Sequence, residues 1–151
     1  MQKPSVDLVA VTISSPSLFG IYQNGKLVKS IIKEGKTSDI LPEVFDDVSK
    51  KYNIKKIIYS KGPGSYMAIK LSYVFFKTVE IAKGIKLYGA EGFEFNGQRP
   101  IKAVGKSFFV KENGIISIKK DLKAGEFSLP ESLNDINFSE ESSPLYILNP
   151  V

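Results

Sequence analysis

The clearest signal in this 151-residue sequence is the segment Ser60-Lys61-Gly62-Pro63-Gly64-Ser65-Tyr66. It follows the apolar run Ile57–Tyr59 and precedes a helical pattern that continues to Lys83. Glycine loses much conformational freedom on folding and proline removes a hydrogen-bond donor, so a turn rich in both indicates a constrained backbone path. The segment therefore predicts a tight turn from a strand into a helix.

This turn has two interpretations. Gly62, Pro63, Gly64 and Ser65 are candidates for binding an anion, because the free N–H groups and the dipole of a helix N-terminus favour negative charge. However, no G-x-x-x-x-G-K-[ST] pattern is present, and Pro63 supplies no donor. The other interpretation is a rigid elbow that sets the direction of the helix, and the sequence leaves both open.

Before the turn, the sequence predicts a three-stranded antiparallel meander. The run Val6–Ile13 is typical of a buried strand. Two further apolar runs, Leu18–Tyr22 and Leu27–Ile32, flank an Asn24-Gly25 pair. Both residues of such a pair tolerate positive φ, so the pair predicts a hairpin.

The next element is an amphipathic helix over residues 38–51, with Thr37 or Ser38 as its expected cap. Its apolar residues recur at intervals of three and four, which places them on one side. They are Ile40, Leu41, Val44, Phe45, Val48 and Tyr52.

The helix expected over residues 66–83 is apolar on two sides, so it either lies inside a larger body or is covered by a partner. The chain is short for covering both sides itself, which favours a partner. We assign to the core side Met67, Leu71, Val74, Phe75, Val79, Ile81 and Ala82. We assign to a partner interface Tyr66, Ile69, Lys70, Tyr73, Phe76, Lys77 and Glu80.

The order of elements predicts an α/β fold, in which the meander is followed by helix, strand, helix and a strand at Ile85–Gly89 in one mixed sheet. This is the layout of an actin-like or ribonuclease H-like lobe, and we place it in residues 1–98. Residues 99–151 are expected to form a reduced second lobe of short strands, with a hairpin at Asn113-Gly114. An acidic, extended or loosely ordered tail follows, and residues 145–148 are expected to form a short strand or anchor.

Composition excludes several kinds of chemistry. The chain has no cysteine and no histidine, so Ser-His-Asp, Cys-His and HExxH sites cannot occur in it. Residues 1–120 carry 20 basic and 10 acidic groups, which is compatible with a solvated surface or with weak RNA binding. We predict no catalytic residue, no metal ligand and no membrane span, and we expect a cytoplasmic protein.

The segment Ser38-Asp39-Ile40-Leu41-Pro42, the turn Gly62–Tyr66 and the residues Ile69-Lys70-Leu71 together resemble the TsaB (YeaZ) family. That family is glycoprotease-like, has an actin-like fold and takes part in making threonylcarbamoyladenosine in transfer RNA. The resemblance covers about residues 6–92. The chain departs from the family pattern at Met67-Ala68 and Lys70, and at Val11-Thr12-Ile13 after the first strand.

The resemblance implies a non-catalytic scaffold whose helices 38–51 and 66–83 bind a TsaD-like enzyme, or a second copy in a homodimer. It implies no intrinsic cofactor, ATP or ADP only at a partner interface, a TsaE-like ATPase as a further partner, and indirect or weak contact with transfer RNA. The alternative hypothesis is a nucleotide-binding enzyme of the actin-like ATPase class that uses Gly62–Ser65.

Overall fold

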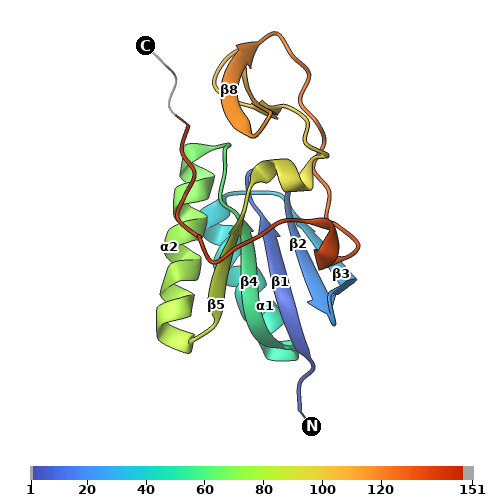
Figure 1. Cartoon of the computed structure of the whole chain (residues 1–151). Coiled ribbons are helices and arrows are strands. Elements are labelled where there is room, and N and C mark those ends of the chain that lie inside the picture. Colours follow the sequence, from blue (N-terminus) through green and yellow to red (C-terminus); the bar gives the residue numbers. More distant parts are fainter. Residues whose placement is uncertain (1, 148–151) are drawn as a thin grey trace.

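A five-stranded mixed sheet is the centre of the computed structural model, which describes residues 2–147 (Figure 1). Its strands lie in the order β3-β2-β1-β4-β5. Their bounds are Ser5–Val11 for β1, Ser17–Gln23 for β2, Lys26–Lys33 for β3, Asn53–Ser60 for β4 and Lys86–Ala90 for β5. Because β1 to β3 pair antiparallel while β4 and β5 run parallel to β1, the predicted meander and the mixed α/β sheet are confirmed.

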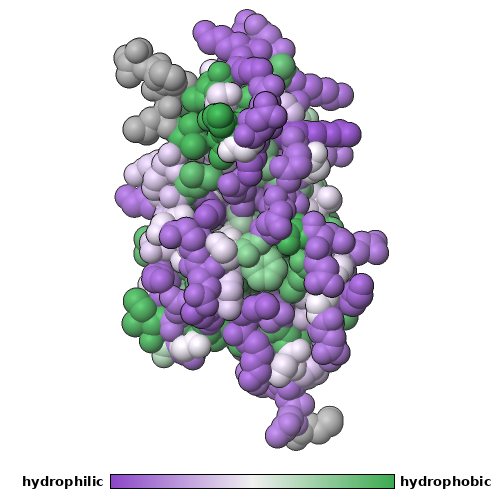
Figure 2. Space-filling view, in the orientation of Figure 1, coloured by the Kyte–Doolittle hydropathy of each residue, from purple (hydrophilic) through white to green (hydrophobic). Residues whose placement is uncertain are grey.

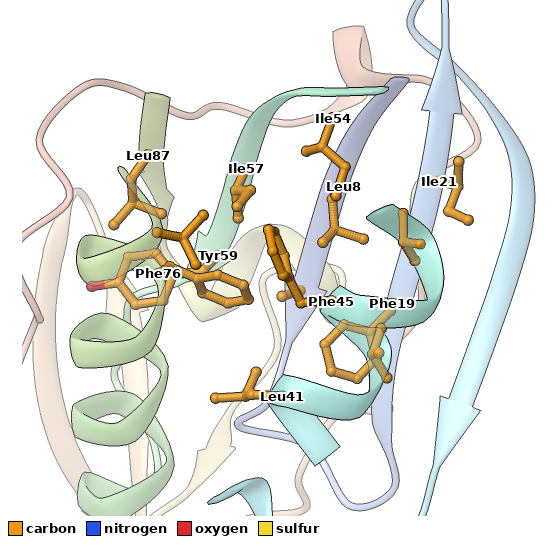
Figure 3. Packing of buried hydrophobic residues seen from close by; sticks show 14 of the residues in the cluster. Leu8, Phe19, Ile21, Leu41, Phe45, Ile54, Ile57, Tyr59, Phe76 and Leu87 are labelled. Carbon is orange, nitrogen blue, oxygen red and sulfur yellow. The ribbon is translucent and has the colours of Figure 1, made fainter. Parts of the chain in front are cut away.

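Helices α1 (Thr37–Lys51) and α2 (Tyr66–Lys83) cover one face of this sheet. Figure 3 shows Phe45 and Leu41 of α1 and Phe76 of α2 among side chains from the strands. The predicted stripe of α1 is confirmed, since five of its six residues are buried and Tyr52 is half-buried. The predicted cap is wrong: the N-cap residue is Lys36, and no side chain caps this helix end.

The opposite face of the sheet is covered by the short helix η1 (Gly92–Phe95) and by the C-terminal segment, which contains the short helix η2 (Leu133–Asp135). Leu133 and Ile136 are buried against strand residues such as Val9. The Leu133 N–H donates to the carbonyl of Gly25 at 2.9 Å. The tail is therefore extended, as predicted, but it is not loosely ordered.

This packing differs from the predicted grouping of residues 99–151 as a separate second part. Residues 127–138 contribute side chains to the core of the first sheet, and Gly89 and Ser139 exchange two backbone hydrogen bonds of 2.9 and 3.0 Å. Because apolar residues in this region are spaced irregularly between polar ones, periodicity alone did not reveal the packing.

A second, three-stranded antiparallel sheet lies beyond one end of the first (Figure 1). It consists of β6 (Ile101–Lys102), β7 (Ser107–Glu112) and β8 (Ile115–Lys120). Its inner side packs through Ile101 and Phe109 on Phe93 of η1. The predicted hairpins are both present, with positive φ at Asn24 and Gly25 and at Asn113 and Gly114.

Neither α1 nor α2, the helices longer than one turn in the described residues, has the length and apolar character needed to cross a membrane.

Candidate functional site

Neighbouring atoms pack closely against both glycines of the turn between β4 and α2. Gly62 has φ of 115°, and a Cβ built there would lie 2.9 Å from Cδ1 of Ile69 and would also meet the carbonyl oxygen of Leu145. At Gly64 a Cβ would lie 2.9 Å from Cβ of Ile13. Only glycine fits such positions without displacing its neighbours. This packing favours the elbow interpretation, and anion binding by Gly62–Ser65 stays a prediction.

Ser65 and a group of buried hydroxyls fix the start of α2. The Ser65 Oγ accepts a hydrogen bond from the N–H of Ala68 at 3.4 Å, which caps the helix. Thr12 Oγ1 and Ser72 Oγ are 2.6 Å apart, and the Thr12 N–H donates to Ser60 Oγ at 3.3 Å. These bonds join the end of β1 to β4 and α2, and they hold the helix on the sheet.

Sequence reasoning missed the position of Ser72. The available signal was a small polar residue among apolar ones on a single side of the helix, which is typical of a buried hydroxyl with a partner. Thr12, at the end of the first buried strand, was the partner to look for.

Our assignment of the two sides of α2 is wrong in part, although Val79 is buried in the core and Phe75 packs against it, as predicted. Ile69 and Phe76 were assigned to a partner interface, but each is 1% exposed and lies inside the fold. Conversely Met67, Val74 and Ile81 were assigned to the core, but they are 58%, 55% and 80% exposed. Since both sides are apolar, the helical count did not distinguish them; the buried Ser72 and the contacts of the loop decide the orientation.

Tyr73, Tyr66 and Lys70 of the predicted interface lie in three different surroundings. Tyr73 packs on the core, with its ring centroid 6.2 Å from that of Tyr59. Tyr66 is exposed, and its ring stacks on Tyr146 with centroids 4.7 Å apart. Lys70 is exposed on the outer part of the helix.

Lys77 and Glu80 form an internal polar bridge. Lys77 Nζ lies 2.7 Å from the Glu80 carboxylate, which also accepts the N–H of Leu87 at 2.7 Å. The hydrogen bond from Lys77, followed by that from the Leu87 backbone, lowers the pKa of Glu80. Glu80 therefore ties the end of α2 to β5, a role within the chain.

The C-terminal segment covers the side of α2 and the elbow that we had expected a partner to cover. The Tyr59 hydroxyl donates to the carbonyl of Ser142, and the Leu145 N–H donates to the carbonyl of Lys61 at 2.7 Å. Figure 1 shows this segment, in red, crossing below η1 and rising beside α2. The predicted anchoring by residues 145–147 is confirmed, no strand forms there, and residue 148 lies outside the described residues.

The outer side of α2 continues into a groove between α1 and α2. Met67, Val74 and Ile81 are seven residues apart, so they lie on one line along the helix, with half-buried Leu71 and Phe75 beside them. The adjoining groove has a volume of about 700 Å³ and is lined by residues that include Pro42, Phe45, Phe75 and Ala82.

A second cleft, also of about 700 Å³, lies between the elbow and the second sheet. It is lined mainly by apolar and aromatic side chains, among them Tyr66, Met67 and Tyr146. Lys102 of β6 is its charged lining residue. Across residues 2–147, no group of three or more acidic, histidine or cysteine side chains is placed to hold a metal ion.

Solved structures of other proteins share this arrangement. One is YeaZ from Pseudomonas aeruginosa, which matches with a TM-score of 0.60 and 12% sequence identity over 78% of this chain and 65% of that chain. This chain has the YeaZ fold. The resemblance to the TsaB (YeaZ) family seen in the sequence is thus confirmed for the fold, including the actin-like or ribonuclease H-like layout.

Another structure is an uncharacterized protein described as similar to peptidase YeaZ from Pseudomonas aeruginosa, with a TM-score of 0.58 and 13% identity over 78% of this chain and 64% of that one. The matched part of this chain thus spans less than two-thirds of either YeaZ-like structure. No protein-family model and no curated protein matches the sequence.

Proposed function

We propose that this chain is a non-catalytic subunit of the transfer-RNA threonylcarbamoyladenosine machinery, and that it binds a TsaD-like enzyme or a second copy of itself. The YeaZ fold and the family-like segments around residues 38–42 and 62–71 support the assignment to this machinery. The chain contains neither histidine nor cysteine, which removes the commonest general base and the cysteine nucleophile of peptidases.

The observation that carries the proposal is the exposed stripe of Met67, Val74 and Ile81 on α2. Large apolar side chains gathered on one surface of a soluble protein are a mark of an interface, because water contact with them is unfavourable. A spacing of seven residues suits packing against another helix. The groove beside Phe75 extends this surface to α1 and could receive such a helix.

The charges around this surface are complementary between the two helices. Helix α1 has four acidic and two basic residues, a net charge of −2, and α2 has three basic and one acidic, a net charge of +2. Of the exposed acids of α1, Glu43 and Asp46 are paired with Lys33 and Lys50 within the chain. In a two-fold dimer, α1 of one copy can face α2 of the other, which sets acidic groups against basic ones. A TsaD-like enzyme with a similar pair of helices would meet the same pattern.

In this proposal the subunit acts by holding its enzyme partner in an active arrangement. It needs no cofactor of its own. ATP or ADP would be held at an interface with a partner such as a TsaE-like ATPase.

The proposal is tested by comparing Val74→Glu with Val28→Glu in the full chain. Both valines are about half exposed, at 55% and 51%, but Val28 lies on β3, away from the stripe. A charge buried in an interface is costly, so Val74→Glu should weaken association at least tenfold while Val28→Glu does not. Sedimentation of the chain alone, and mixed with the TsaD-like subunit from the same cells, measures both modes.

Far-UV circular dichroism of each variant checks that the fold is intact. If the chain forms no dimer and no complex with the TsaD-like subunit, or if both variants associate like the wild type, the proposal is wrong.

A further inference from the structure

We propose that the cleft between the elbow and the second sheet, together with the lysines at its rim, is a binding site for single-stranded nucleic acid, with a base in the cleft and phosphates on the lysines. This site lies at the N-terminal end of α2 and shares Met67 with the exposed stripe. Val74, Ile81 and the groove between α1 and α2 lie outside it, so it does not depend on a protein partner being bound there.

The charge of the second sheet is the first reason. Residues 99–123 carry seven basic groups and two acidic ones, a net charge of +5, which equals the net charge of the whole chain. The remainder of the molecule is therefore balanced, and the excess positive charge is concentrated in this small sheet and its connections. Such a concentration attracts the phosphates of a nucleic acid.

The strand pairing brings these lysines to one end of the sheet. Lys102 pairs with Phe108, which pairs with Lys119, while Lys120 pairs with Ser107. The carbonyl of Lys106 accepts a hydrogen bond from the N–H of Asp121 at 3.2 Å, so Lys106 lies there too. All four lysines are exposed.

Most of this positive charge is available to a ligand. Within residues 2–147, ion pairs of this region join Lys111 to Glu91 and Lys119 to Glu112, each at 2.6 Å. Lys102, Lys106, Lys120 and Lys123 take part in none of the ion pairs found in the described residues. Lys102 Nζ donates one hydrogen bond to the carbonyl of Gly105, at 3.1 Å, and keeps its full charge.

The cleft supplies the second requirement, a surface on which a base can stack. Tyr66 is 58% exposed and Tyr146 is 39% exposed, and both line the cleft beside Met67. Stacking on aromatic rings is the usual way in which proteins hold unpaired bases. A volume of about 700 Å³ is within the usual range for sites that hold small molecules, so the cleft has room for a base.

The two parts are contiguous, because Lys102 belongs to both the cleft lining and the lysine group. Figure 2 shows apolar side chains gathered between the upper end of α2 and the second sheet, with hydrophilic side chains over the sheet itself. An apolar cleft bordered by unpaired lysines fits a ligand with stacked bases and a charged backbone better than it fits an apolar peptide.

Fluorescence anisotropy with a labelled ten-nucleotide single-stranded RNA tests the inference in the full chain. The variant Lys106→Gln/Lys120→Gln is compared with the control Lys29→Gln/Lys36→Gln, which removes the same charge from exposed lysines on β3 and before α1. We expect the first to weaken binding at least tenfold, and the control to change it less than twofold. The slope of log K against log salt should fall by roughly 0.7 for each rim lysine removed.

The cleft is tested separately with Tyr66. Tyr66→Ala should weaken binding roughly five- to a hundredfold, as expected for loss of one stacked base, whereas Tyr66→Phe should bind like the wild type. A duplex of the same length should bind more weakly than the single strand. Absence of binding at low salt, equal losses in the two lysine variants, or Tyr66→Ala binding that equals wild type would overturn the inference.

Discussion

The two long sides of α2 are both apolar, yet the molecule treats them differently. On the inner side, Ile69 and Phe76 are fully enclosed by the sheet and the elbow. On the outer side, Met67, Val74 and Ile81 remain open to solvent. A helix that is apolar on two sides needs protein packed against both of them. Hydrophobicity alone does not determine which side packs against the helix's own chain.

The inner side is distinguished by features other than hydrophobicity. Ser72 finds a buried hydroxyl partner in Thr12, and the C-terminal segment adds Tyr146 and Leu145 around the start of the helix. These contacts come from residues 60 or more positions away in the sequence. The outer side has no comparable contacts among residues 2–147, which is why we propose that another protein chain covers it.

The largest contrast between the two sides should appear in stability. Phe76→Ala removes a buried ring whose centroid lies 6.5 Å from that of the Tyr59 ring. It should therefore lower the free energy of unfolding by roughly 3–5 kcal/mol. Val74→Ala should change the free energy of unfolding by less than about 0.5 kcal/mol, since the residue is exposed and alanine is a better helix former. Urea unfolding followed by circular dichroism measures both.

If Phe76→Ala does not fold, Phe76→Leu provides a milder truncation for the same comparison. A loss for Val74→Ala as large as that for the Phe76 variants would contradict the assignment of the two sides.

The elbow should be the next most sensitive element. Gly62→Ala combines an unfavourable positive φ with contacts to Ile69 and Leu145, so we expect a loss of roughly 2–3 kcal/mol in unfolding free energy. Gly84→Ala is the matched control, because Gly84 also has positive φ but a Cβ added there would meet no atom within 4 Å. It should lose only about 1 kcal/mol. Equal losses in the two variants would mean that the packing around Gly62 does not add to the cost of the substitution.

The contact between the C-terminal segment and the rest of the chain should contribute less to the free energy of unfolding. Tyr59→Phe removes the hydroxyl that donates to Ser142, which should cost about 1 kcal/mol. The loss should be local, so amide hydrogen exchange should accelerate at Leu145, whose N–H is bonded to Lys61. Unchanged exchange at that amide would show that the segment is held without Tyr59.

The polar bridge at the end of α2 should have the smallest effect. Glu80→Ala removes the acceptor for Leu87 and should lower the unfolding free energy by roughly 0.5–1 kcal/mol near pH 7. The pKa of Glu80 in the folded state is lower than its usual value of 4.5. The ionised Glu80 therefore stabilises the fold fully above pH 4.5, and this stabilisation is lost as the pH falls through the folded-state pKa. The stability gap between wild type and variant, measured by thermal unfolding, should thus narrow in acid; a constant gap would refute this role.

Local sequence signals predicted much of the fold. The pairs Asn24-Gly25 and Asn113-Gly114 both form turns with positive φ, and the stripe of α1 packs as its spacing indicates. The limits of α2 were also predicted, since Gly64-Ser65 and Gly84 mark its two ends. Each of these features depends on residues that are close in the sequence.

The orientation of α2 and the burial of Leu133 and Ile136 could not be predicted in the same way. Both depend on contacts between the first sheet and a distant segment without periodicity. The cleft beside Tyr66 was missed for the same reason, because its walls come from the elbow, the second sheet and Tyr146. The elbow itself was identified, but its neighbours were not.

The most direct test of the account is site-specific photo-crosslinking from the outer side of α2. A photoreactive phenylalanine analogue is placed in the full chain at position 74, on the stripe, or at position 28, on β3. We predict that position 74 crosslinks to a second copy of the chain or to the TsaD-like subunit when that protein is added, and that position 28 does not. Crosslinks from position 28 alone, or none from position 74 with either protein, would contradict the account.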